Sequence, residues 1–104
     1  MGRDRRATGA PLRLVRVSPR YLRQAIRVGA PPGSVASGDA ARTMRQLATA
    51  DTLPLPGDVR AAMPPTGVAY VRRVLGRNLW LWYAFSDTTL SVLTLASTPP
   101  VPLD

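Results

Sequence analysis

The stretch Val68–Ala96, VAYVRRVLGRNLWLWYAFSDTTLSVLTLA, decides the fold of this 104-residue chain. It holds three runs rich in β-branched and aromatic residues, at 68–75, 79–85 and 89–96, and each run predicts a β-strand. Three residues separate each run from the next, and connections this short join antiparallel neighbours. The stretch therefore predicts a three-stranded antiparallel meander.

The middle run of the meander, 79–85, carries no charged residue, which predicts a central strand with both faces covered. Because side chains alternate between the two faces of a strand, Trp80 and Trp82 share one face and Tyr83 lies on the other. We interpret both tryptophans as core residues beneath the helices. The alternative is a platform on which nucleic-acid bases stack.

Residues 11–17 predict a further strand, in which Arg13 and Arg16 face solvent or a ligand. A helix start follows at Ser18-Pro19, because serine is a favoured cap and proline is favoured at the first helical position. We expect this helix over 19–28. Its apolar side is expected to consist of Tyr21, Leu22, Ala25 and Ile26.

The rest of the chain is punctuated by glycine and proline. A second helix is expected from a cap at Ser37 to about Ala50. Four prolines in 51–67 predict a linker lying over the surface, with one short turn at most. The tail 97–104 contains three prolines, which remove backbone donors, so neither a helix nor a central strand is expected there.

These elements predict an α+β domain in the order β-α-α-β-β-β, with an antiparallel sheet and a helical hairpin packed on one face. The domain is expected to span 11–96. Residues 1–10 are expected to form a disordered basic arm, and 97–104 a proline-rich tail that runs along the body or moves freely.

The composition excludes several classes of site. Histidine, lysine, glutamate and cysteine are all absent. Metal sites built from imidazole or thiolate, Ser-His-Asp triads, lysine Schiff bases and P-loops are therefore excluded, and we expect no metal and no cofactor. No run of eighteen apolar residues is present, so we expect no membrane partner and a cytoplasmic location.

The net charge of +8 comes from fourteen arginines and six aspartates. Residues 1–50 hold ten of the arginines and two of the aspartates, whereas residues 51–104 hold four of each. An excess of this size on a small domain predicts an anionic partner, with nucleic acid the first candidate. A compositional origin, in a plain interaction domain, is an alternative.

Arg20, Arg23 and Arg27 are spaced three and four residues apart, so they form a row along one side of the first helix. A row of this kind is most often a solvated helix face. The alternative is that the three guanidinium groups contact nucleic-acid phosphates.

Two segments carry a resemblance to a known family. The opening Val15-Arg-Val-Ser-Pro19, and the segment Tyr70-Val-Arg-Arg-Val-Leu-Gly-Arg77 followed by an aromatic strand and a turn with Asp87, resemble RelE/ParE toxins of bacterial toxin–antitoxin pairs. The likeness covers roughly 11–96. Members of this family either cleave messenger RNA on the ribosome, without a metal, or inhibit DNA gyrase.

The resemblance implies catalytic roles for Arg72, Arg73, Arg77 and Tyr83. Fixed guanidinium groups stabilise the charge that builds on a phosphate when a ribose hydroxyl attacks it. Tyr70 and Tyr83 are implied to stack on bases or to handle protons. Arg72 and Arg73 are adjacent, so they point to opposite faces. Both could equally be ordinary edge-strand charges.

The resemblance also implies a cognate antitoxin protein as a partner, with the ribosome and messenger RNA or DNA gyrase as the target. Ribosome-dependent members carry further basic, histidine or tyrosine residues after the last strand, where this chain has Ser97-Thr-Pro-Pro100. Whether the protein is an endoribonuclease is therefore left open. The alternative is a basic RNA- or ribosome-binding module without cleavage activity.

Overall fold

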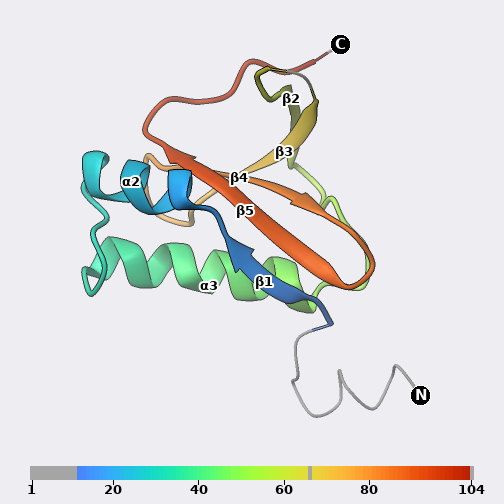
Figure 1. The fold of residues 1–104 in the computed structure, drawn as a ribbon, viewed down its shortest axis with the longest axis horizontal. Coiled ribbons are helices and arrows are strands. Elements are labelled where there is room, and N and C mark those ends of the chain that lie inside the picture. Colours follow the sequence, from blue (N-terminus) through green and yellow to red (C-terminus); the bar gives the residue numbers. More distant parts are fainter. Residues whose placement is uncertain (1–11, 66, 104) are drawn as a thin grey trace.

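The computed structural model describes residues 12–65 and 67–103. These described residues form two helices and one five-stranded mixed sheet, and the fold is therefore α+β with a helical hairpin (Figure 1). The elements in chain order are β1 (Leu14–Val17), α2 (Pro19–Arg27), α3 (Val35–Thr49), β2 (Val59–Ala62), β3 (Val68–Arg73), β4 (Trp80–Phe85) and β5 (Thr89–Ala96). The basic arm expected at 1–10 lies outside the described residues.

The predicted meander is present as β3, β4 and β5, which pair in antiparallel fashion. In the order β1-β5-β4-β3-β2, the uncharged strand β4 is the middle of the five. The prediction of a wholly antiparallel sheet is wrong, because β1 pairs in parallel with β5, Leu14 opposite Thr89. Nothing in the short sequence of β1 specifies which strand edge it meets.

A further strand, β2, lies within the segment that the prolines marked as a linker, and it pairs with β3 in antiparallel fashion. Prolines flank its four residues without interrupting them. Its position at the edge of the sheet leaves the neighbouring prolines out of the ladder. The proline-rich tail runs from the end of β5 across to β2, where Leu103 N–H donates to Arg60 O at 2.8 Å (Figure 1).

Helix α2 begins where the sequence predicts. The Ser18 hydroxyl oxygen accepts a hydrogen bond from Tyr21 N–H at 3.0 Å and donates to Leu93 O of β5 at 2.6 Å. Gly29 follows the helix with φ of +83°, a left-handed conformation that glycine adopts at low cost. Tyr21 and Ala25 are buried, whereas Leu22 and Ile26 are exposed, so only half of the predicted apolar side meets the core.

Helix α3 begins three residues earlier than the predicted cap. Ser34 is the N-cap, and its hydroxyl oxygen accepts from Ser37 N–H at 3.1 Å. Ser37, which we expected to cap the helix, lies inside it. Gly33, with φ of +85°, turns the chain into this start.

We expect Ser34→Ala to lower the free energy of unfolding by about 1 kcal/mol, because the backbone N–H of Ser37 would lose its acceptor. Ser37→Ala is the matched control, and we expect an effect within about 0.5 kcal/mol. Urea denaturation of both variants measures the difference. A larger effect at Ser37 than at Ser34 would contradict the assignment of the cap.

One cluster of buried residues joins both helices to the sheet. Its members on β4 are Leu81 and Tyr83, which face the helices. We call this side of the sheet the core face and the side that carries Trp80 and Trp82 the outer face. Our interpretation of the tryptophans as core beneath the helices is therefore wrong, and both are partly exposed. Alternation separates the two sets of aromatic residues but does not say which face the helices cover.

Helix α2 packs against β5, and it follows β1 along the same edge of that strand. Ser18 N–H donates to Val92 O at 3.0 Å, which ties the junction between β1 and α2 to the middle of β5. No helix among the described residues is long and apolar enough to cross a membrane.

Candidate nucleic-acid interface

The resemblance implies three catalytic arginines in β3 and in the turn between β3 and β4, and these do not converge on one site. Arg72 lies opposite Leu81 and shares the core face with it, whereas Arg73 lies opposite Trp80 on the outer face. This alternation is the predicted one. Arg77 follows β3 in the turn and reaches helix α3.

Arg72 is held by a buried aspartate. Its Nη1 lies 2.6 Å from Asp58 Oδ1, and the Asp58 side chain is 1% exposed. The Tyr83 hydroxyl donates to Asp58 Oδ2, and the N–H of Leu55 donates to the same oxygen at 3.3 Å. The Asp58 carboxylate is therefore satisfied by three donors from β3, β4 and the segment before β2.

Sequence reasoning missed Asp58, which lies in the segment predicted to be a surface linker. Its local contact with the N–H of Leu55 is that of an ordinary turn, and the two side chains that show its role, Arg72 and Tyr83, are fourteen and twenty-five residues away along the chain. Arg72 and Tyr83 do come together, as the resemblance implies, but through this carboxylate and inside the protein. A carboxylate that already neutralises Arg72 leaves less positive charge for a phosphate.

Tyr83 is fully buried, with 0% of its surface exposed. Burial raises the pKa of the Tyr83 hydroxyl well above its usual value, and the hydrogen bond to Asp58 raises this pKa further. The hydroxyl therefore stays protonated at neutral pH and acts as a donor to Asp58. In this position Tyr83 contacts no molecule at the surface.

Arg73 and Arg77 each have other partners. Arg73 donates from Nε to Arg77 O and from Nη2 to Asn78 Oδ1, both at 2.8 Å. Its guanidinium lies 5.8 Å from the centre of the Trp80 ring. Arg77 Nε lies 2.6 Å from Asp39 Oδ2 on α3. These contacts fix the turn after β3 to the body of the protein.

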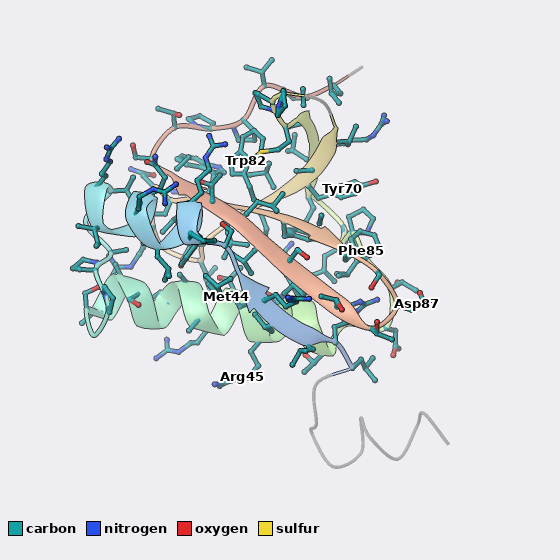
Figure 2. The ribbon with its side chains drawn as sticks, in the orientation of Figure 1. Met44, Arg45, Tyr70, Trp82, Phe85 and Asp87 are labelled. Carbon is teal, nitrogen blue, oxygen red and sulfur yellow. The ribbon has the colours of Figure 1, made fainter. Side chains whose placement is uncertain are left out.

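Tyr70 belongs to a group of three aromatic rings. Its ring centre lies 6.1 Å from that of Tyr83 and 5.7 Å from that of Phe85, and Tyr70 and Phe85 lie on the same side of the molecule (Figure 2). Tyr70 is partly exposed, so it remains available for stacking. Offset contacts of this kind stabilise the fold in their own right.

Arg13 is buried, contrary to our expectation that it faces solvent or a ligand. Only 6% of its surface is exposed. Its Nε donates to Ser86 O at 2.9 Å and its Nη1 to Ala50 O at 2.8 Å, while its guanidinium lies 5.8 Å from the centre of the Phe85 ring. The charge is thus held by two carbonyl groups and an aromatic face.

Arg20, Arg23 and Arg27 lie on the exposed side of α2 as the sequence predicts. None of the three has a hydrogen-bond or ion-pair partner among residues 12–65 and 67–103. A helix rises about 1.5 Å per residue, so the row extends about 10 Å along α2. We call these three residues the α2 arginine row.

The α2 arginine row borders exposed apolar surface. Leu22 and Ile26 are 52% and 61% exposed and lie one turn apart on the neighbouring side of the same helix. A surface that combines unpaired guanidinium groups with apolar side chains suits a partner that is both anionic and partly apolar, such as single-stranded nucleic acid or an acidic helix.

Comparison with protein-family models, with curated proteins and with solved structures gives no match.

Proposed function

We propose that this protein is the toxin of a bacterial toxin–antitoxin pair of the RelE/ParE type and that it acts in the cytoplasm on RNA at the ribosome. The observation that carries the proposal is the α2 arginine row, whose three guanidinium groups are exposed and have no acidic partner among the described residues. Unpaired guanidinium groups on a rigid helix bind phosphates.

The element order supports the family by analogy. A strand, a helical hairpin and an antiparallel meander follow one another here in the order that the sequence predicts, and the strand β2 is an addition. Fold-level likeness alone does not carry a function. The main support for the proposed function is therefore the positive charge of the α2 arginine row.

Binding without cleavage is the second candidate function. The contacts of the three arginines in β3 and the β3–β4 turn favour it. Arg72 is held by Asp58, Arg77 by Asp39 and Arg73 by Asn78, so these groups do not form one free cluster. Stabilising a developing phosphate charge requires donors that are aimed at one point. The protein would then block the ribosome by occupying RNA.

The antitoxin is proposed to be a protein whose acidic segment folds over the α2 arginine row and the adjoining Leu22 and Ile26. Charge complementarity would speed its association, and the apolar side chains would supply buried area. An antitoxin bound there would cover the surface that binds RNA.

The first test is bacterial growth after induced expression. We expect arrest by the wild type and growth with the triple variant Arg20→Ala, Arg23→Ala, Arg27→Ala. The matched control removes three other exposed arginines, Arg42, Arg45 and Arg60, and so has the same net charge. Arrest by the control but not by the α2 variant supports the proposal, provided that soluble levels are equal.

The second test measures binding of single-stranded RNA as a function of salt. Each phosphate contact contributes about 0.7 to the slope of log K against log salt on single strands. Loss of three contacts is therefore expected to reduce the slope by about 2, whereas the control triple variant keeps the wild-type slope. Growth arrest without RNA binding would contradict RNA as the target and would favour DNA gyrase, the other target that the resemblance implies. Neither arrest nor binding by the wild type would contradict the proposal as a whole.

A further inference from the structure

A cavity of about 280 Å³ lies where α2 meets the end of β5 and the start of the tail. Helix α2 contributes Arg20 and Gln24, β4 contributes Trp82 from the outer face, and β5 contributes Thr94. The first tail residues, Ser97 and Thr98, also line the cavity, which is open to solvent. In Figure 2, Trp82 lies beside the point where the tail leaves β5.

The polar side chains of this cavity are not used by the fold. Arg20, Gln24, Thr94, Ser97 and Thr98 make no side-chain hydrogen bond within the described part of the chain. Five polar groups from three segments thus surround one space without partners in the protein. Groups with this arrangement are available to a ligand.

The indole N–H of Trp82 also makes no hydrogen bond within the described residues. This Nε1–H is shut off from solvent as well. Burying such a donor without a partner is unfavourable, and a phenylalanine would fill this position without that cost. The indole therefore contributes a large aromatic surface to the cavity wall and not a hydrogen bond to the fold.

The chemistry of the lining identifies a class of ligand. One guanidinium, no carboxylate, an amide, three hydroxyl groups and an indole meet at the cavity. RNA-binding proteins hold an unstacked base in this way, with an aromatic ring against the base, hydroxyl and amide groups at its edges and an arginine at the phosphate. The volume is just below the range of about 300–1,000 Å³ typical of small-molecule sites, which suits a single nucleotide.

We propose that this cavity binds one nucleotide of single-stranded RNA, with its base against Trp82 and its phosphate at Arg20. This inference rests on the proposed RNA-binding function and deepens it, since Arg20 belongs both to the cavity and to the α2 arginine row. The row continues from the cavity along the exposed side of α2, where Arg23 and Arg27 would meet the next phosphates of the same strand. A free nucleotide shares this chemistry but would leave Arg23 and Arg27 unused.

Tryptophan fluorescence tests the proposal directly, because the chain has two tryptophans and only Trp82 lines the cavity. In Trp80→Phe, we expect a single-stranded oligoribonucleotide to quench the remaining emission with the same dissociation constant that anisotropy of a labelled oligonucleotide gives. In Trp82→Phe, the emission of Trp80 is expected to stay nearly constant during the titration. Circular dichroism and thermal unfolding confirm that both variants are folded.

Affinity provides the second readout. Stacking of one base contributes about 1–3 kcal/mol, which corresponds to about 5-fold to 150-fold in dissociation constant, so we expect Trp82→Ala to weaken RNA binding within that range. Gln24 is partly exposed on α2, so we expect Gln24→Ala to leave the protein folded. We expect this substitution to weaken RNA binding several-fold. Arg20→Ala, which removes the guanidinium proposed to hold the phosphate, is also expected to weaken RNA binding. Its control is Arg45→Ala, which removes one exposed charge from α3 on another side of the molecule (Figure 2).

The outcomes separate the cavity from the wider function. RNA binding with unchanged Trp82 emission, and with Gln24→Ala equal to wild type, would overturn the cavity proposal and leave the proposed function standing. Quenching by nucleoside monophosphates as strong as that by the oligonucleotide would overturn the RNA strand as the ligand. No binding of either probe by the wild type would overturn both proposals.

Discussion

Asp58→Asn is expected to lower the free energy of unfolding by about 3 kcal/mol. Breaking a buried ion pair by removing one partner costs about 3–5 kcal/mol, and the low end applies because the Arg72 side chain is 26% exposed and keeps some contact with water. The amide would retain one acceptor oxygen for the Tyr83 hydroxyl but leave the Arg72 charge without a carboxylate. Urea denaturation at neutral pH measures the change.

The control for this substitution is Asp87→Asn, which removes the same charge from the exposed turn between β4 and β5 (Figure 2). We expect it to change stability by less than about 0.5 kcal/mol. A double variant, Asp58→Asn with Arg72→Met, is expected to recover part of the loss, because no unpaired charge remains. Equal effects of the two aspartate substitutions would show that the Asp58 network contributes nothing specific.

The contact between Asp58 and Arg72 limits what substitutions of the β3 arginines can show about activity. Replacing Arg72 would leave a carboxylate with 1% exposure and no cation beside it. Loss of activity in such a variant would then report loss of folding. Arg73 is exposed, hydrogen-bonds to neighbours in the turn and lies over the Trp80 ring. Because its loss would leave no buried charge unpaired, an effect of replacing Arg73 on activity is interpretable.

Arg13→Met is expected to lower the free energy of unfolding by about 2 kcal/mol. Two hydrogen bonds from the charged guanidinium, to Ser86 O and Ala50 O, would be lost, and each is worth about 1.5–3 kcal/mol. Part of this loss in stability is offset, because Arg13 is only 6% exposed and burying its charge is itself unfavourable. The methionine keeps the buried aliphatic part of the side chain, but it loses the contact of the guanidinium with the Phe85 ring.

Arg16→Met provides the matched control on the same strand, since Arg16 is exposed and its side chain has no partner among the described residues. We expect its effect to stay within about 0.5 kcal/mol. Thermal unfolding of the two variants at equal salt compares them. Should Arg13→Met prove as stable as Arg16→Met, the desolvation of Arg13 would offset its two hydrogen bonds completely.

Arg13 matters for the fold because it joins three segments that are distant in sequence. Its donors reach the end of α3 at Ala50 and the β4–β5 turn at Ser86, and the backbone N–H of Arg13 donates to Ala48 O at 3.1 Å. The entry to β1 is thereby fixed against both neighbours. This arginine is a structural residue, whereas the α2 arginine row is free to bind a partner.

The sequence by itself determined the elements whose signals are local. Alternation and short turns specify β3, β4 and β5, and Ser18-Pro19 specifies the start of α2, because the physical causes lie within a few residues of each other. The exposure of Arg20, Arg23 and Arg27 follows from helical spacing in the same way. These are the features on which the proposed function rests.

Only the tertiary structure decided which segments meet. The parallel pairing of β1 with β5, the strand β2, the choice of the face beneath the helices, and the burial of Arg13 and Asp58 each depend on groups far apart along the chain. A guanidinium or a carboxylate has the same local pattern whether it faces water or a buried partner, since burial is settled by what packs over it. The cavity at Trp82 is of this kind, because residues from α2, β4, β5 and the tail line it together and none of these segments predicts it alone.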